Sequence, residues 1–124
     1  MAKILTIEIR PADEALEDFR QTFDAVAAGQ RVRRRDAVYF TSIEAARNLL
    51  TPGRLALLRA IRAKQPGSIY ELAQTVGRDL KNVQDDLRLL ARYGLVRMRR
   101  GRRLGREVKA PEAPFDEIAL KIAI

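Results

Sequence analysis

The chain lacks three residue types that often carry chemistry in proteins. Its 124 residues include no cysteine, no histidine and no tryptophan. Without cysteine and histidine, disulfides, thiolate or imidazole metal sites, and Cys-His or Ser-His-Asp nucleophile systems are all excluded. The remaining residues form no recognisable phosphate loop or activated nucleophile. We therefore expect a protein that is not an enzyme and that has no metal site and no cofactor.

Aromatic residues and long hydrophobic runs are also scarce. Phenylalanine and tyrosine make up only 6% of the chain, which disfavours recognition of single-stranded nucleic acid by base stacking. The apolar run in residues 1–10 is interrupted by Thr6 and Glu8, so it matches neither a signal peptide nor a membrane span. The expected location is the cytoplasm, with no membrane partner.

Positive charge is abundant and unevenly distributed. The net charge is +8, and residues 30–67 and 94–110 carry +7 and +6, respectively, against acidic flanks. A balance this basic commonly indicates a polyanionic partner, usually nucleic acid. The charge pattern therefore favours a nucleic-acid-binding protein.

Two segments, residues 3–10 and 118–124, have the period-2 alternation of half-buried strands, and residues 38–43 are a further short strand candidate. Isolated short strands are marginally stable, so the two end segments should pair with each other. The pairing could occur within one chain or across a homodimer, and the sequence does not choose between these alternatives.

Two further segments precede the central part of the chain. Residues 13–28 have helical spacing with an acidic outer face, and residues 30–36 read as an arginine-rich loop. The loop is either a solvated charged segment or a phosphate-contacting arm. Thr41 and Glu44 fit a capping box that opens a short helix over residues 42–50.

Three helices are predicted in series over the central residues. Thr51-Pro52 opens the first, which ends near Pro66-Gly67; Ser68 and Glu71 cap the second, which ends at Gly77; the third runs from Leu80 to Gly94. Their apolar positions recur at helical intervals: Leu57, Leu58, Ile61, Ile69, Leu72, Ala73, Val76, Leu80, Val83, Leu87 and Leu90. The second and third helices have the spacing of a helix-turn-helix.

The stretch RMRRGRRLGREVK, residues 97–109, is either a disordered basic tail or a hairpin. Its halves LVRMRR and GREVKA can pair as strands across GRRL, and Val96, Met98 and Val108 alternate with basic residues. We favour the hairpin. Helix, helix-turn-helix and hairpin in this order predict an α+β (mainly α) fold, a winged helix-turn-helix over residues 51–110. Residues 1–50 would form a strand-helix arm for interaction or dimerisation, and residues 111–124 a closing strand.

The central segment has an LTP opening at residues 50–52, GRD followed by KNV at the turn into the third helix, and a GLV exit at residues 94–96. With these segments, residues 50–96 resemble the MarR/ArsR-type winged helix-turn-helix regulators of prokaryotes, and in particular a group of small DNA-binding proteins that share them. The resemblance implies a transcription regulator, and some of the similar proteins look like antitoxins encoded beside a toxin.

A recognition helix places its N-terminal residues against base edges in the major groove. We therefore expect Arg78 or Lys81 to contact guanine, Asn82 or Gln84 to contact adenine, and Arg88 to contact phosphate. Asp85 would pair with Lys81 or accept from cytosine, and Asp86 would bond a nearby arginine or helix end. The predicted DNA-binding residues are Ser68, Arg78, Lys81, Asn82, Gln84, Arg88, Arg97, Arg99, Arg100, Arg102, Arg103 and Arg106.

The sequence thus predicts a double-stranded DNA-binding transcription regulator that represses its own promoter. Because such regulators bind paired half-sites, the default assembly is a homodimer formed by the first 30 and last 10 residues. The alternative is an antitoxin that neutralises a protein toxin and binds its own promoter. Its toxin-binding surface would be the acidic helix 13–28 or the loop from Arg31 to Arg35.

Overall fold

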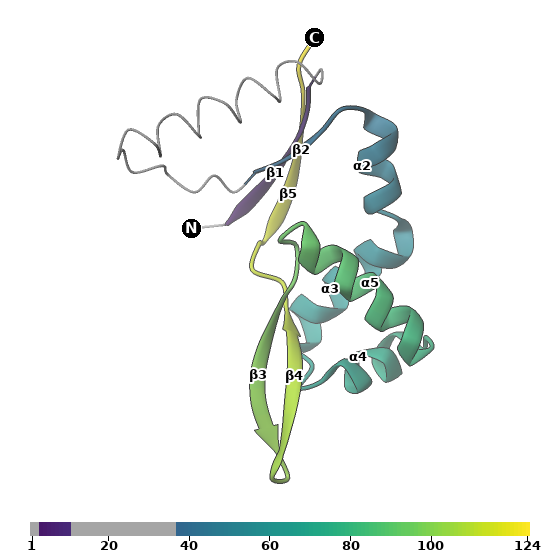
Figure 1. The fold of residues 1–124 in the computed structure, drawn as a ribbon, viewed down its shortest axis with the longest axis vertical. Helices are drawn as coiled ribbons and strands as arrows, with labels where there is room; N and C mark the ends of the chain where they lie inside the picture. The colour runs from purple at the N-terminus through teal and green to yellow at the C-terminus, as the bar shows by residue number, and fades with distance from the viewer. Residues whose placement is uncertain (1–2, 11–36) are drawn as a thin grey trace, which may run out of the picture. The chain divides into compact units, whose positions relative to one another are not determined.

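A computed structural model of the chain describes residues 3–10 and 37–124 (Figure 1). The predicted helix 13–28 and basic loop 30–36 lie outside the described residues. The chain divides into two units, one of residues 1–48 with 117–124 and the other of residues 49–116.

The first unit is built on a three-stranded parallel sheet. Its strands are β1 (Ile4–Ile9), β2 (Ala37–Phe40) and β5 (Glu117–Ile122), in the order β2-β1-β5. The predicted strand and its buried apolar side are confirmed, since Leu5, Ile7 and Ile9 are buried, but Glu8 on the other side is buried too and not exposed as expected. The two ends of the described chain therefore meet in one sheet, which is the intramolecular alternative for the end strands.

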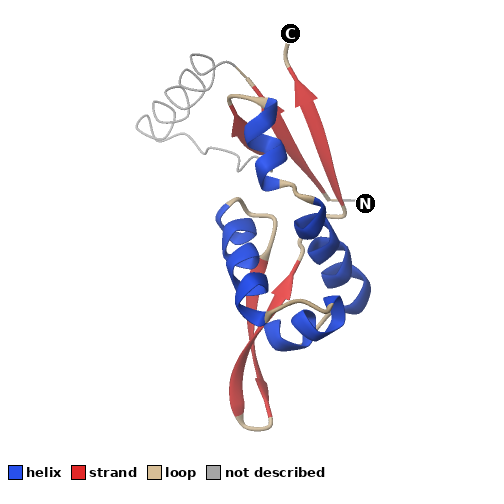
Figure 2. Cartoon of the chain, turned by 90° about the vertical axis from the view of Figure 1, so that its right-hand side faces the viewer, coloured by secondary structure: helices blue, strands red, loops and turns tan. Residues whose placement is uncertain are grey.

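A short helix, α2 (Ile43–Leu49), follows β2 and lies beside the sheet in both Figure 1 and Figure 2. The side chain that caps its first turn is Ser42, whose Oγ accepts a hydrogen bond from the N–H of Ala45 at 3.2 Å. The sequence placed the cap one residue earlier, at Thr41. Because serine and threonine are equally able to cap, adjacent candidates are not distinguished by residue type.

The second unit begins with three helices, α3 (Pro52–Lys64), α4 (Ile69–Val76) and α5 (Leu80–Arg92). Thr51, Ser68 and Asp79 are their N-caps, each accepting a backbone hydrogen bond three residues on. The buried side chains of these three helices are Leu57, Leu58, Ile61, Leu72, Ala73, Val83, Leu87 and Leu90. All eight come from the predicted apolar stripes, which confirms the three helices.

An antiparallel hairpin follows the helices and extends past them in both views (Figures 1 and 2). It consists of β3 (Arg97–Arg103) and β4 (Arg106–Glu112), and we call residues 97–112 the basic hairpin. The predicted hairpin is confirmed, but its expected loop GRRL is wrong. The strands continue through Arg103, and the turn is Leu104-Gly105, with φ of 53° and 76°. Two positive φ angles in a two-residue loop match the twist of the paired strands.

The register places the apolar residues of the hairpin on both of its faces. Met98 lies opposite Pro111, whereas Val108 lies opposite Gly101. Directly opposed residues share a face and successive residues alternate, so Met98 and Val108 are on opposite faces. Near the helices Ala110 and Pro111 are buried, and toward the turn the hairpin is exposed on both sides.

The predicted fold class, a mainly α winged helix-turn-helix with strand arms, is wrong. Of the described residues, 43% are helical and 31% lie in strands, and three of the strands form a parallel sheet. The prediction placed the end strands outside the main fold. A strand needs partners for its backbone N–H and C=O groups, and β1, β2 and β5 satisfy this need by pairing with one another. Among the described residues, no helix is both long and apolar enough to cross a bilayer.

Candidate nucleic-acid interface

The helix α5 has one buried and one exposed side. Val83, Leu87 and Leu90 are completely buried and fix the helix against the rest of its unit. The exposed side carries Lys81, Asn82, Asp85 and Arg88, with the half-buried Gln84 at its margin. Leu80, which the sequence placed on the inner side, is 36% exposed. The first two turns of α5 therefore present cationic and amide side chains to solvent.

Asp85 pairs with Arg88 and not with Lys81 as predicted. The carboxylate Oδ1 lies 3.6 Å from Nη1 of Arg88, and the two side chains are 54% and 76% exposed. An exposed pair at this separation contributes little to stability. Lys81 has no ion-pair partner among the described residues, so its ammonium group is available to a ligand.

Asp86, the neighbouring carboxylate, has a different role. Its Oδ1 accepts from Nε of Arg54 at 3.0 Å, and its Oδ2 accepts from Nη2 of Arg78 at 2.7 Å. Arg54 also donates to the carbonyl oxygen of Leu49. These part-buried contacts join the start of α3, the turn before α5 and α5 itself. The expectation that Asp86 bonds a nearby arginine is confirmed.

Arg78 is therefore less accessible than a base-reading residue would be. One guanidinium nitrogen is bound to Asp86, and Nη1 is buried without a hydrogen-bond acceptor in the described part of the chain. Arg54 belongs to the same cluster but was not singled out in the sequence, because it lies outside any charge run or apolar stripe.

Ser68 serves as a helix cap. Its Oγ accepts from the N–H of Glu71 at 3.0 Å, while Oε2 of Glu71 accepts from the N–H of Gly67 at 2.9 Å. A hydroxyl that accepts a hydrogen bond can still donate its own proton. The half-buried Ser68 thus keeps one donor for a phosphate oxygen.

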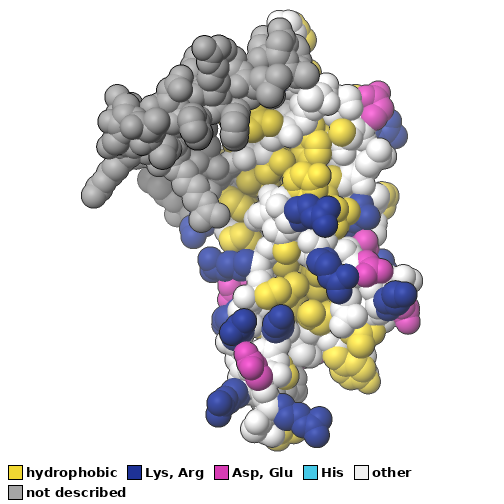
Figure 3. All heavy atoms as spheres, in the orientation of Figure 1, with side chains coloured by type: hydrophobic (Ala, Val, Ile, Leu, Met, Phe, Trp, Pro, Cys, Tyr) yellow, Lys and Arg dark blue, Asp and Glu magenta, His cyan; other side chains and the backbone are white. Residues whose placement is uncertain are grey.

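The basic hairpin carries seven cationic side chains and two carboxylates. Glu112 holds Arg97 and Arg99 at 2.8 and 3.5 Å, and Glu107 lies 3.8 Å from Arg100. Arg102 and Arg106, nearer the turn, are exposed and have no ion-pair partner in the part of the chain that is described. The side chain of Arg103 is outside the description. Figure 3 shows Lys and Arg side chains spread over the hairpin.

The electrostatic balance changes along the hairpin. The hydrogen bond from Arg97 holds the pKa of Glu112 below its ordinary value of 4.5; partial burial opposes this, and the charges of Arg97 and Arg99 add to it. Glu112 is therefore negative at neutral pH and offsets part of the positive charge of Arg97 and Arg99. Most of the excess positive charge lies toward the turn.

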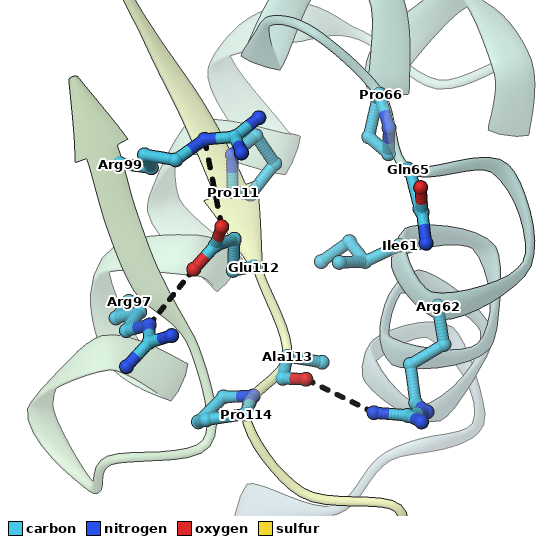
Figure 4. A pocket seen from close by; sticks show the side chains of 10 residues that line it. All are labelled: Ile61, Arg62, Gln65, Pro66, Arg97, Arg99, Pro111, Glu112, Ala113 and Pro114. Carbon is cyan, nitrogen blue, oxygen red and sulfur yellow. Dashed lines mark hydrogen bonds and ion pairs between the residues drawn. The ribbon is translucent and has the colours of Figure 1, made fainter. Parts of the chain in front are cut away.

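A cavity of about 320 Å³ lies between the end of α3 and the base of the hairpin (Figure 4). Arg62 lines it and donates to the carbonyl oxygens of Ala113 and Phe115 at 3.1 and 2.9 Å, and it also pairs with Asp116. Arg97 and Arg99, on the opposite wall, are held by Glu112. Glu112 thus binds Arg97 and Arg99 within the hairpin, and Arg62 joins α3 to the segment that follows the hairpin, residues 113–116.

Among the described residues, no group of three or more Asp and Glu side chains could hold a metal ion.

A family model described as HVO_A0114 matches residues 49–120, more than half of the chain. That description states no activity, and the resemblance to MarR/ArsR regulators stays a prediction. No curated protein and no solved structure matches the chain.

Proposed function

The chain belongs to the HVO_A0114 family, and we propose that it is a sequence-specific double-stranded DNA-binding protein that regulates transcription by occupying its own promoter. The basic hairpin is the observation that carries this proposal. Each phosphate neutralised by a lysine or arginine releases condensed counterions, so a projecting cluster of unpaired cations favours a polyanion. Among the described residues Arg102 and Arg106 are such cations, and Lys109 is exposed on the same hairpin.

The exposed side of α5 supplies the sequence-reading part of the proposal. The major groove of B-form DNA is wide enough to admit one α-helix. Lys81 would then contact guanine O6 and N7, and Asn82 or Gln84 would contact adenine. Arg88 would exchange its weak pair with Asp85 for a phosphate. Asp85, released in this way, can accept from the N4 amino group of cytosine.

The rigid support behind α5 makes base reading physically reasonable. The three buried side chains of its inner face and the Asp86 contacts to Arg54 and Arg78 fix its orientation. Side chains on a fixed helix lose less conformational entropy on binding than those on a mobile segment. The antitoxin alternative stays a prediction, because its candidate toxin-binding segments lie outside the described residues.

Fluorescence anisotropy tests the proposal directly. The purified chain is titrated onto a labelled duplex from upstream of its own gene and onto a scrambled duplex, at rising salt concentration. We expect the native duplex to stay bound at salt concentrations that release the scrambled one. Release of both duplexes together would leave only non-specific attraction and would overturn sequence-specific regulation.

Two sets of variants separate the roles of the hairpin and the helix. Replacing Arg102 and Arg106 by alanine should weaken binding to every duplex and reduce the slope of log affinity against log salt by about two. The matched control replaces Arg59 and Lys64, two exposed cations of α3, and loses the same net charge. Equal slopes for both double variants would show that the hairpin has no special contact with phosphate.

The helix is tested by Asn82→Ala, which should change sequence preference and leave the salt slope unchanged. Loss of one good bidentate base contact costs about 1–3 kcal/mol of discrimination at that base pair. The measurement is competition between duplexes substituted one base pair at a time. An unchanged preference profile would remove Asn82 from the reading surface.

A further inference from the structure

The strand β5 lies at an edge of the parallel sheet, and its outer side has no partner strand among the described residues. On its inner side the N–H of Glu117 donates to the carbonyl of Lys3, and the N–H of Ala123 donates to the carbonyl of Ile9, both at 3.3 Å. Backbone groups of successive strand residues point in opposite directions. Residues 117, 119, 121 and 123 therefore face β1, and Ile118, Leu120 and Ile122 direct their N–H and C=O groups outward.

The side chains of β5 are unusually apolar for an exposed edge. Leu120 and Ile122 are 54% and 48% exposed, although their neighbours Ile7 and Ile9 on β1 are buried. Soluble proteins commonly protect edge strands with prolines, bulges or several charges, because open edges bind further strands. Residues 117–122 contain no proline, and their charged residues are Glu117 and Lys121 alone.

The spacing of these two charges makes the strand complementary to itself. Glu117 and Lys121 lie four residues apart, on the same face as Ala119, midway between them. In a two-fold antiparallel pair centred on Ala119, each Glu117 is opposite Lys121 of the second copy. Centring the pair on Ile118 or Leu120 leaves both charges opposite uncharged side chains, and centring it on Lys121 opposes like charges. One register therefore satisfies both charges.

We propose that β5 pairs with β5 of a second copy of this chain, antiparallel and centred on Ala119, to give a homodimer with a continuous six-stranded sheet. The backbone pattern agrees with this register. The outward-facing Ile118 comes opposite Leu120 of the second copy, where both residues can exchange N–H···O bonds. The Glu117–Lys121 and Ala119–Ala119 pairs occupy positions without such bonds, where opposed side chains lie closest.

The dimer does not depend on the proposed DNA binding. A two-fold dimer would carry two copies of α5 and would thus suit paired half-sites, but its formation is measured without nucleic acid.

The absence of cysteine from the chain allows a direct test of the register. In the Ala119→Cys variant the two new thiols would meet at the two-fold axis, with Cα atoms about 4.5 Å apart, within reach of a disulfide. The control is Ala123→Cys, one residue past the end of β5 but still hydrogen-bonded to Ile9 of β1, whose two copies would be about 26 Å apart. Under mild oxidation we expect a disulfide-linked dimer from the first variant and none from the second. Equal cross-linking of both variants would overturn the register.

Light scattering of the unmodified chain tests the dimer itself, and charge reversal tests its complementarity. We expect a mass of twice 14.0 kDa for the unmodified chain. Glu117→Lys alone and Lys121→Glu alone should each shift the chain toward monomer, because each opposes like charges. Mixing the two variants should restore a dimer, because lysines at 117 and 121 then face glutamates.

Each charge variant needs a check of its own fold, which circular dichroism provides. Lys121 lies opposite Glu8 within the chain, so Lys121→Glu also affects β1, whereas Glu117 lies opposite the uncharged Ile4. Glu117→Lys is therefore the decisive single variant. A monomeric unmodified chain, or a dimer that Glu117→Lys leaves as tight as before, would overturn the proposal.

Discussion

The two units of the molecule are held together over different distances along the chain. In residues 49–116, each helix packs against the next one and the hairpin closes on itself through a two-residue turn. In the other unit, Ile9 of β1 pairs with Phe40 of β2 and Ile122 of β5. Non-local pairing requires closure of long loops before any contact forms. The unit of residues 49–116 can therefore fold from local interactions, whereas the sheet of the other unit needs strands from both ends of the chain.

The difference extends to burial. Leu57, Leu72, Leu87 and Leu90 of the helical unit are completely buried, whereas β5 leaves half of Leu120 and Ile122 exposed. Burial of apolar surface is the main source of stability in both units. β5 has no buried side chain, whereas α3, α4 and α5 each have two or three, so we expect the sheet to be more easily disrupted than the unit of residues 49–116.

The largest effect should come from removing β5. A chain that ends at Asp116 loses one of the two neighbours of β1, and the remaining two-stranded sheet is marginal. We expect the amides of β1 to lose nearly all protection from hydrogen exchange, whereas those of α3 and α5 stay protected. The control chain lacks only Ile124, which lies beyond β5. Retained protection in β1 would show that the sheet does not depend on its C-terminal strand.

This contrast explains what the sequence could predict about the fold. The caps at Thr51 and Ser68, the apolar stripes of α3 to α5 and the hairpin are local patterns, and the structure confirms them. The parallel pairing of β1 with β2 and β5 joins segments that are far apart in the sequence. It could not be predicted, because an alternating pattern identifies a strand but does not indicate which strand it pairs with. The fold class was wrong for this reason. The turn at Leu104 was missed because leucine has no preference for positive φ.

The candidate site shows the same division. The exposed positions of Lys81, Asn82 and Arg88 follow from the helical period of α5, so the sequence could locate them. The particular arginines that bind Asp86 could not be identified in this way, because Arg78 lies across a turn and Arg54 comes 32 residues before Asp86. Side-chain networks between helices depend on packing angles that a sequence period does not contain.

The second-largest effect is expected on stability, from replacing Asp86, which joins α3 and the turn before α5 to α5 in the unit of residues 49–116. Asp86→Ala leaves the guanidinium groups of Arg54 and Arg78 partly buried without their carboxylate. Breaking a fully buried ion pair costs about 3–5 kcal/mol, and exposure of these side chains to between 17% and 33% reduces that. We expect the free energy of unfolding to fall by about 2 kcal/mol, measured by urea denaturation.

The adjacent carboxylate provides the matched control for this prediction. Asp85→Ala removes only an exposed contact to Arg88 and should change the free energy of unfolding by less than about 0.5 kcal/mol. Similar losses for both variants would mean that the Asp86 cluster does not hold the helices together. The same pair of variants separates stability from DNA binding, because only Asp85 is on the exposed side of α5.

The smallest effect concerns the titration of Glu112 at the base of the hairpin. Its pKa should lie below the ordinary value of 4.5, chiefly because Arg97 donates a hydrogen bond to the carboxylate at 2.8 Å. A carboxyl group with a lowered pKa in the folded state stabilises the fold at pH above its unfolded value, and this contribution is lost as pH falls through the folded value. The hairpin base should therefore loosen only in acid, below pH 4.5.

Carbon-detected NMR titration of the Glu112 side chain measures this directly. Arg97→Ala should raise the pKa toward 4.5, and Arg99→Ala should raise it less, because Arg99 acts through charge at 3.5 Å without the hydrogen bond. Arg106→Ala, at the far end of β4, is the control and should leave it unchanged. A pKa that moves equally in all three variants would indicate that the general positive field of the hairpin, and not the Arg97 contact, sets the charge of Glu112. The base and the turn of the hairpin would then be electrostatically alike, and the available cations would not be confined to the residues near the turn.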